Sequence, residues 1–466
     1  MSSFEQNKIT QGARWLSVAV MMAVLFFAPS WMHAAVQGET GSSFILSASA
    51  GYVSMADGAS IYSWGYAGGT GQMQLPGPTL IVNQGTAVTV TLNNNLPVAA
   101  GNTSIVFPGQ QVTATGGVAG LLTHEAQPGG TVTYTFTASR PGTFLYHSGT
   151  RTDLQVEMGL YGALIVLPTS SAGCPAKGPY SLAASAYNDI PGATAGSVVN
   201  PTCYDREYLF LLSEMQIEIH QAVDAQVSGP GPIEVAMEPY TPEYWMINGR
   251  GAPDTMELPN MGVMPHQPYN SMPRMHPGEK VLLRIIGAGR QMHSFHTHGN
   301  HVRVLARDGQ VLVSPTDPTK LEAKLEFSVP TLPGQTVDGT FEWTGKDLGW
   351  DIYGHTAADG IACVDVSGDG FDDTTKEWCA DHRKPIPVLL PNPNVLGNGG
   401  FYSGSPFLGD LVQLPPGQGG LNPNAGFTYM WHSHVERELT NGNIFPGGLM
   451  TMLVVEPPTA PINELQ

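Results

Sequence analysis

The chain is poor in charged residues, above all in positive ones. Only 12% of its 466 residues are charged, and 20 Lys and Arg stand against 38 Asp and Glu, for a formal net charge of −18. Binding to the phosphate backbone of a nucleic acid needs a basic surface, so this balance excludes such a partner. The low charge, together with 56 Gly and 38 Pro, favours many short strands joined by turns over long solvated helices. The composition therefore predicts an all-β protein of two or three domains.

Long apolar runs are missing after about residue 40, so we expect no membrane span in the mature protein. The N-terminus does carry an apolar run, Trp15 to Ala28, with Lys8 and Arg14 before it and the small pair Ala34-Ala35 after it. This run is too short for a stable span, and its flanks are typical of a cleaved secretory signal peptide at residues 1–35. The sequence therefore predicts a secreted or periplasmic protein.

Cysteine is scarce as well, with Cys174, Cys203, Cys363 and Cys379 as the full set. An even number in an exported chain usually forms disulfides. Nearness in sequence favours Cys174 with Cys203 and Cys363 with Cys379, although four cysteines allow three pairings. None stands beside a histidine in a ligand pattern, so a thiolate ligand for copper has no obvious donor.

Strand and turn patterns divide the chain into two parts. Apolar and polar residues alternate from Thr86 to Leu92 and from Thr131 to Thr137, which is typical of half-buried strands. A small, polar, Gly- and Pro-rich linker separates these strands from a second strand-rich part. The predicted segments are the signal peptide at 1–35, domain 1 at 43–168, the linker at 169–202 and domain 2 at 203–457, with a long irregular insertion at about 345–420.

The insertion contains DVSGDGFDD, whose acidic spacing is like that of a calcium loop. Asp365, Ser367, Asp369 and Asp373 would supply the oxygen ligands. The position that should close the loop with an acidic residue is Lys376 instead. Calcium at this loop is one hypothesis, and a solvated loop held by a disulfide is the other.

Histidines gather in QMHSFHTHGNH, which follows a predicted strand. By the two-residue period of a strand, His296 and His298 point to one face, whereas His293 can reach a separate site on the opposite side. Imidazoles at this spacing suit copper or zinc. The pattern therefore predicts a metal site.

Two further motifs add histidines to this set. His432 and His434 flank Ser433 in WHSH. By itself, this pair could be polar residues at the end of a strand without a ligand role. The presence of the first histidine cluster favours metal binding by this pair as well. The segment FLYHSG offers only His147, and a lone histidine of this kind is more typical of a structural, hydrogen-bonded residue.

The order of these motifs resembles that of multicopper oxidases. PGPTLIVNQG, GTFLYHSG followed by GLYGALIV, HSFHTHG, and WHSH with a downstream PGGLM look like the landmarks of the family. The domain count is similar to that of the two-domain members, such as small laccases and nitrite reductases. The resemblance implies two cupredoxin-like Greek-key β-barrels and, because the two-domain members form their copper cluster between neighbouring subunits, a homotrimer.

The resemblance also implies a role for each histidine. In the family pattern HxxHxH, the first histidine binds the blue copper and the other two bind the three-copper cluster. The implied copper ligands are His147, His293, His296, His298, His432 and His434.

Several ligand positions of the family pattern hold other residues here. The blue-copper cysteine is replaced by serine, which predicts loss of that site because it depends on a soft thiolate. Five cluster histidines remain, so we expect fewer than four copper ions and no four-copper laccase-type activity. The positions without the family ligand are Val106, Phe107-Pro108, Gly149, Ser433, Glu438 and Asn443.

Three functions stay open at this point. The first is a copper-binding protein for storage, delivery or detoxification. The methionine- and histidine-rich segment 261–276 would then add copper ligands. The alternative for this segment is that it only covers a hydrophobic surface. The second is a divergent oxidoreductase that acts on a small reductant or metal ion with O2. Glu436 or Glu438 would then transfer protons near the metal. The alternative for these glutamates is a surface ion pair with Arg437. The third is a metal-free structural or interaction module.

Overall fold

Strands dominate the computed structural model, which confirms the predicted all-β fold. It contains the short helices α2 (Thr152–Glu157) and α3 (Ile217–Gln226). None of the helices described is long and apolar enough to cross a membrane. The predicted signal peptide lies outside the described residues, which are 36–69, 71–170, 174, 184–188, 200–317, 320–385, 405–408, 426–458 and 460–462.

The first barrel consists of a five-stranded sheet in the order β3-β2-β5-β9-β6 and a four-stranded sheet in the order β1-β4-β11-β10, with the small pair β7-β8. In β5 and β9, buried and more exposed residues alternate as the sequence predicts. Its elements are β1 (Glu39–Thr40), β2 (Ser43–Ser54), β3 (Ser60–Gly68), β4 (Gly77–Asn83), β5 (Ala87–Asn94), η1 (Val98–Ala100), β6 (Thr113–Gly116), β7 (Val118–Ala119), β8 (His124–Glu125), β9 (Thr131–Thr137), β10 (Gly142–His147) and β11 (Tyr161–Leu167).

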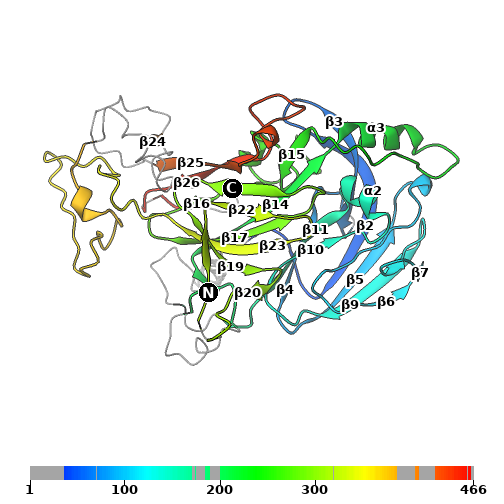
Figure 1. Cartoon of the computed structure of the whole chain (residues 1–466), viewed down its shortest axis with the longest axis horizontal. Helices are drawn as coiled ribbons and strands as arrows, with labels where there is room; N and C mark the ends of the chain where they lie inside the picture. Colours follow the sequence, from blue (N-terminus) through cyan, green and yellow to red (C-terminus); the bar gives the residue numbers. More distant parts are fainter. Residues whose placement is uncertain are drawn as a thin grey trace, which may run out of the picture.

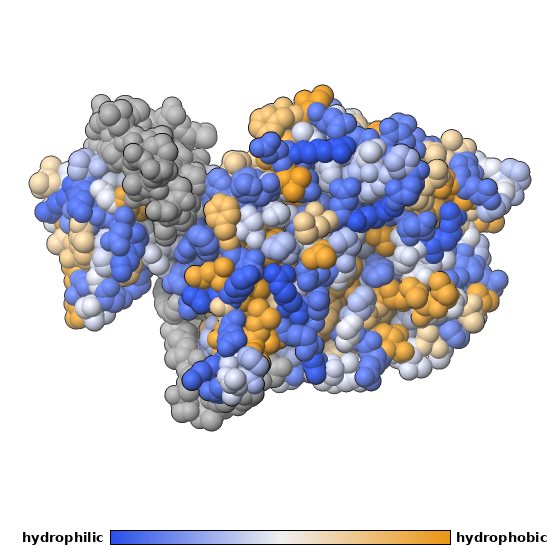
Figure 2. All heavy atoms as spheres, viewed as in Figure 1, coloured by the Kyte–Doolittle hydropathy of each residue, from blue (hydrophilic) through white to orange (hydrophobic). Residues whose placement is uncertain are grey.

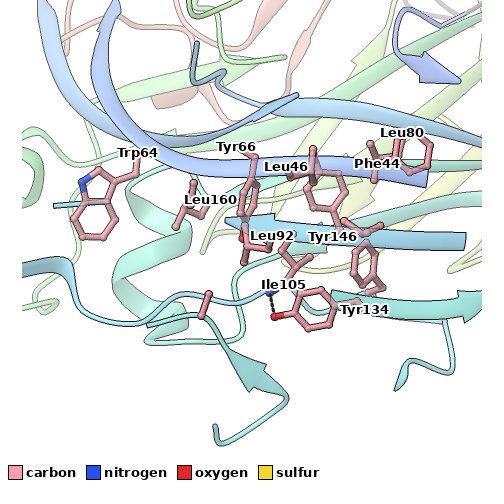
Figure 3. Packing of buried hydrophobic residues seen from close by; sticks show 14 of the residues in the cluster. Phe44, Leu46, Trp64, Tyr66, Leu80, Leu92, Ile105, Tyr134, Tyr146 and Leu160 are labelled. Carbon is pink, nitrogen blue, oxygen red and sulfur yellow. Dashed lines mark hydrogen bonds between the residues drawn. The ribbon is translucent and has the colours of Figure 1, made fainter. Parts of the chain in front are cut away.

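Aromatic side chains fill the core of the first barrel. Trp64, Tyr66, Tyr134 and Tyr146 are fully buried there, and Figure 3 shows them among the aliphatic side chains that they contact. The hydroxyl of Tyr134 accepts a hydrogen bond from the backbone N–H of Ile105 at 3.1 Å. The buried tyrosines thus keep a polar partner while their rings pack.

The second barrel consists of a seven-stranded sheet, β15-β14-β17-β23-β19-β20 with β21 on β19, and a six-stranded sheet, β16-β26-β25-β18-β22 with β24 on β25. A short pair, β12-β13, precedes it. The elements are β12 (Ala184–Ser185), β13 (Cys203–Tyr204), β14 (Arg206–Met215), β15 (Tyr244–Ile247), η3 (Asp254–Met256), β16 (Arg274–Met275), β17 (Lys280–Gly287), β18 (His293–Thr297), β19 (Val302–Arg307), β20 (Gln310–Val311), β21 (Lys324–Glu326), β22 (Ser328–Thr331), β23 (Thr336–Glu342), η4 (Cys379–Asp381), β24 (Ser405–Leu408), β25 (Gly426–Ser433), η5 (Glu436–Glu438) and β26 (Met450–Val455).

The two barrels pack against each other, with the first at the right and the second at the centre of Figure 1. Thr143 on β10 links them, because its hydroxyl bonds Asp338 of β23 at 2.6 Å and Arg284 of β17 at 3.0 Å. Residues 345–385, yellow to orange, project from the second barrel at the left. Hydrophilic residues cover much of the face shown in Figure 2. The boundaries of the predicted domains stay predictions.

Both predicted disulfides are confirmed. Cys174 is bonded to Cys203 and Cys363 to Cys379, and no cysteine is free. The second disulfide lies inside the projecting segment 345–385.

Candidate functional site

The two histidine motifs of the second barrel meet on neighbouring strands. β18 pairs with β25 in antiparallel register, which places His296 directly opposite His432. The alternate residues Phe295 and Trp431 are fully buried and anchor the strands in the core. The indole N–H of Trp431 also donates to the carbonyl of His298 at 3.0 Å. Strand alternation thus sends apolar side chains into the barrel and the imidazoles to the other side.

Three imidazoles converge at this place. One ring nitrogen from each of His296, His298 and His432 lies within 4.8 Å of those of the other two, and Nε2 of His298 is 3.1 Å from Nε2 of His432. The exposed ring of His434 is close by, with its centroid 5.1 Å from that of His296 and 5.9 Å from that of His432. We call the first three residues the histidine trio.

Backbone carbonyls fix how two of these rings are protonated. The Nδ1–H of His296 donates to the carbonyl of Phe327 at 2.7 Å, and that of His432 donates to the carbonyl of Ser433 at 2.6 Å. In the neutral rings, both Nε2 atoms then keep their lone pairs for a metal. Nδ1 of His298 is buried and has no hydrogen-bond partner, while Nε2 of this ring contacts Nε2 of His432.

The environment keeps the trio neutral at pH 7. Burial and, to a smaller extent, the neighbouring imidazoles lower the pKa of His296 and of His298 to about 4. Burial and His434 likewise lower the pKa of His432. Only the neutral ring binds a metal ion, so the donor set, its protonation and its spacing fit a transition metal.

Comparisons with known proteins show similarity to multicopper oxidases. The family profile described as multicopper oxidase matches residues 50–171. The chain is 27% identical over 212 residues to laccase abr2 of Aspergillus fumigatus, and 31% identical over 185 residues to L-ascorbate oxidase of Cucurbita pepo var. melopepo. Residues 50–171 thus belong to a domain of the multicopper oxidase family. This family implies copper as the cofactor.

The coverage of these matches is partial. They span 42% and 38% of this chain, but only 33% of the laccase and 27% of the ascorbate oxidase, so the chain spans about a third or less of the length of these relatives. The solved blue copper oxidase from Nitrosomonas europaea is 20% identical, with a TM-score of 0.50 over 89% of this chain and 86% of that one. This similarity shows the cupredoxin-type fold that the motifs predict.

The first barrel brings together the positions where the family pattern places histidines that this multicopper oxidase homologue lacks. Val106 forms an isolated bridge with His147, and a Cβ atom added at Gly149 would lie 2.7 Å from Cγ1 of Val106. The Nδ1–H of His147 donates to the carbonyl of Ser148 at 2.9 Å, which leaves Nε2 available, as in His432. Burial lowers the pKa of His147. His147 is not part of the trio.

His293 lies in a different setting, on the core side of β18. Its Nε2 is 2.9 Å from a carboxylate oxygen of Glu214, and its Nδ1 is 3.0 Å from one of Glu438. Burial lowers the pKa of His293, but the hydrogen bonds and charges of the two carboxylates outweigh this effect and raise it to about 9. The ring is therefore a buried imidazolium held between two carboxylates. We call these three residues the carboxylate clamp.

The glutamates predicted to handle protons differ in exposure. Glu438 is buried in the carboxylate clamp, whereas Glu436 is exposed on η5. Sequence reasoning missed Glu214, the third member of the clamp. A signal was available, because Glu214 is an acidic residue in the largely apolar run YLFLLSEM. An acidic residue in such a run usually has a buried partner.

A second group of metal-binding residue types lies in the insertion, and sequence reasoning missed it entirely. One donor atom from each of its members lies within 4.8 Å of the others. The only local signal is the spacing of four residues in DIYGH, since the other two members follow some twenty residues later. The members are Asp351, His355, Glu377 and His382.

In the calcium-like loop, the carboxylates of Asp365 and Asp373 accept hydrogen bonds from groups of the loop itself. The carboxylate of Asp365 accepts bonds from the hydroxyl of Ser367 and from the backbone N–H groups of Gly368, Asp369 and Gly370. The carboxylate of Asp373 accepts one from the N–H of Val366. Calcium binding at this loop stays a prediction.

Proposed function

We propose that this protein is an exported copper-binding member of the multicopper oxidase family, which holds copper at the histidine trio. The observation that carries the proposal is the convergence of three neutral imidazoles, two of them with their tautomers fixed by backbone carbonyls. Three imidazoles suit copper in either oxidation state. Bound copper would supply one-electron redox chemistry at this position.

The other histidines of the family pattern differ in how well their surroundings suit copper binding. His434 lies next to the trio and is free to turn toward it, because its side chain is exposed. His147 presents an available Nε2 from the first barrel. His293 has weaker support, since a copper ion would have to displace Glu214 or Glu438 from one of its ring nitrogens.

The proposal includes no blue-copper site. A blue site needs a thiolate, and all four cysteines of the chain are in disulfides. Ser433, at the position of the family cysteine, is fully buried, and its hydroxyl accepts the N–H of Val435 at 3.1 Å. We therefore propose fewer than four copper ions per chain.

The methionine-rich segment contributes to packing rather than to this site. Met264 and Met275 are buried, and Met275 belongs to the core of the second barrel. Both ring nitrogens of His276 have partners, the carboxylate of Glu279 and the carbonyl of Ala460. This favours the interpretation that the segment covers hydrophobic surface, so the proposal does not include it among the copper ligands.

The test is copper analysis of variants. Replacing His296 and His298 together with Ala should remove most of the bound copper, because it removes two of three ligands. The matched control is His301→Ala, which removes a neighbouring histidine that lies outside the trio. Equal copper loss in both variants, or retention of copper in the double variant, would show that the site is misassigned.

A divergent copper oxidoreductase is a second candidate. The specific observation is that three imidazoles converge in the trio. Three protein ligands are typical of catalytic rather than structural metal sites, in which the metal also binds water or substrate. The substrate class would be a small reductant or a reduced metal ion, with O2 as the oxidant. Oxygen consumption with phenols, Fe(II) or Mn(II) tests this, with the His296→Ala/His298→Ala variant as the blank. Equal consumption by both proteins would exclude it.

Export and assembly complete the proposal. Export is supported by the basic flank and apolar run of residues 1–35, and sequencing the N-terminus of the mature protein tests it. A homotrimer is supported by the likeness to two-domain members. Because His147 is the only histidine of the family pattern left in the first barrel, copper contributes little across a subunit junction, and a trimer should survive a chelator in light scattering. A trimer that falls to monomers on copper removal would contradict this.

A further inference from the structure

The insertion contains a cluster of four buried or nearly buried side chains of the types that bind metal ions. Asp351 and Glu377 are 0% and 2% exposed, and His355 is 7% exposed. Asp351 and His355 lie on the outgoing arm of the insertion, and Glu377 and His382 lie on the returning arm. We call this group the arm cluster.

Both imidazoles of the arm cluster turn Nδ1 toward the carboxylates. Nδ1 of His355 is 3.1 Å from Oδ2 of Asp351 and 3.2 Å from Oε2 of Glu377. Nδ1 of His382 is 2.8 Å from Oε1 of Glu377 and 3.4 Å from Oδ2 of Asp351. Two nitrogens and two carboxylates therefore face a single point.

The far side of the His382 ring fixes its tautomer. Nε2 is 3.1 Å from the carbonyl oxygen of Ile361, and a carbonyl can only accept, so Nε2 carries the proton. In the neutral ring, the Nδ1 lone pair then faces the oxygen lone pairs of Glu377. This contact is favourable if a metal cation stands between them or a proton is shared across it.

Two buried carboxylates side by side need positive charge. In the described part of the chain, neither Asp351 nor Glu377 forms an ion pair with a Lys or Arg side chain; the two histidines are their only basic partners. The backbone N–H groups of Tyr353 and Arg383 orient Asp351 at 2.8 Å each. These hydrogen bonds hold the Asp351 carboxylate in the orientation that a metal ligand needs.

We propose that Asp351, His355, Glu377 and His382 bind one Zn²⁺ ion in a closed structural site. Ligands at about 2.0–2.2 Å around a tetrahedral zinc lie about 3.3–3.6 Å from each other. The four nitrogen–oxygen distances here are 2.8, 3.1, 3.2 and 3.4 Å, so zinc would require three of these pairs to move slightly apart. Two imidazoles and two carboxylates suit zinc, whereas calcium and magnesium prefer oxygen alone and Cu(II) prefers a tetragonal arrangement.

The zinc would tie the insertion to the barrel core. Trp350, Ile352 and Tyr353, which flank Asp351, pack in the core of the second barrel. The returning arm is joined to the outgoing arm by the hydrogen bond from Tyr353 to the carbonyl of Thr375 and by the disulfide of Cys363 with Cys379. A metal ion bridging both arms at this point would hold the base of the insertion closed.

The experiment measures zinc binding by metal-stripped, full-length protein that carries His296→Ala/His298→Ala, because the imidazoles of the histidine trio would also take zinc. This background protein should bind one zinc per chain, and its X-ray absorption spectrum should show nitrogen and oxygen ligands and no sulfur. Adding His355→Gln/His382→Gln should weaken zinc binding by more than about 100-fold, because losing even an outer-shell partner costs about 10–100-fold. Adding Asp365→Asn in the same insertion should leave zinc binding unchanged.

Limited proteolysis supplies a readout that does not depend on the affinity. Zinc should protect the insertion of the wild type and of Asp365→Asn from cleavage, and it should not protect the His355→Gln/His382→Gln variant. The single variant His355→Gln provides the same comparison if the double variant does not fold. In the background without the histidine trio, zinc binding that persists in the arm-cluster variants, or that is absent when the arm cluster is intact, would overturn the proposal.

Discussion

The carboxylate clamp makes a definite prediction about stability and pH. The pKa of His293 is about 9 in the folded protein, against 6.5 for the free side chain. Below pH 6.5 both the folded and the unfolded chain carry this proton, and the stabilisation by Glu214 and Glu438 is fully present. As the pH rises through 9, the folded protein loses the proton and the stabilisation with it. At about 1.36 kcal/mol per pKa unit, the loss is roughly 3 kcal/mol of unfolding free energy.

The variant Glu438→Gln isolates this effect. Glutamine keeps an oxygen that accepts from Nδ1 of His293 but removes one of the two charges, so the variant should lose about 1–2 kcal/mol at pH 6. The assay is guanidinium unfolding of copper-free protein at pH 6, 7.5 and 9.5, followed by tryptophan fluorescence. The difference between wild type and variant should shrink or reverse at pH 9.5. A difference that stays constant, or grows with pH, would refute a buried imidazolium at His293.

Three further predictions follow from the same structure. The copper-loaded protein should lack the intense absorption near about 600 nm that a copper–thiolate bond produces, which a visible spectrum checks and which a blue protein would contradict. Copper should stay bound down to about pH 5, because the pKa values of His296 and His298 are about 4; dialysis against a pH series measures this, and half-release near pH 6.5 would show solvent-exposed ligands. Trp431→Ala should lower the unfolding free energy by about 3–5 kcal/mol, since Trp431 is fully buried beside His432, and a loss under 1 kcal/mol in denaturant unfolding would contradict that packing.

Local patterns were sufficient for the strands and for the meeting of the histidine motifs. The alternation in Thr86–Leu92 and Thr131–Thr137 reappears as the paired strands β5 and β9. The HxxHxH and WHSH motifs lie on adjacent strands, as their joint resemblance to a known pattern predicts. Such features depend on residues a few positions apart, and the period of a strand dictates them.

Partners that are distant in sequence could not be predicted in this way. Glu214 and Glu438 meet at His293 from strands and turns that are 79 and 145 residues away from it. In the arm cluster, an irregular segment folds back on itself, and no periodicity relates Asp351 to Glu377. Charged side chains are rare in this chain, so a buried one signals a partner, but only the folded structure shows which partner it has.

Copper stoichiometry joined to electron paramagnetic resonance tests the central claim most directly. The purified protein, loaded with Cu(II) and freed of excess metal, should hold at least one and fewer than four copper ions per chain. Its spectrum should show nitrogen hyperfine structure from imidazole ligands, and the His296→Ala/His298→Ala variant should lose that signal. Protein that retains no copper, or whose copper signal is unchanged in the variant, would contradict copper binding at the histidine trio.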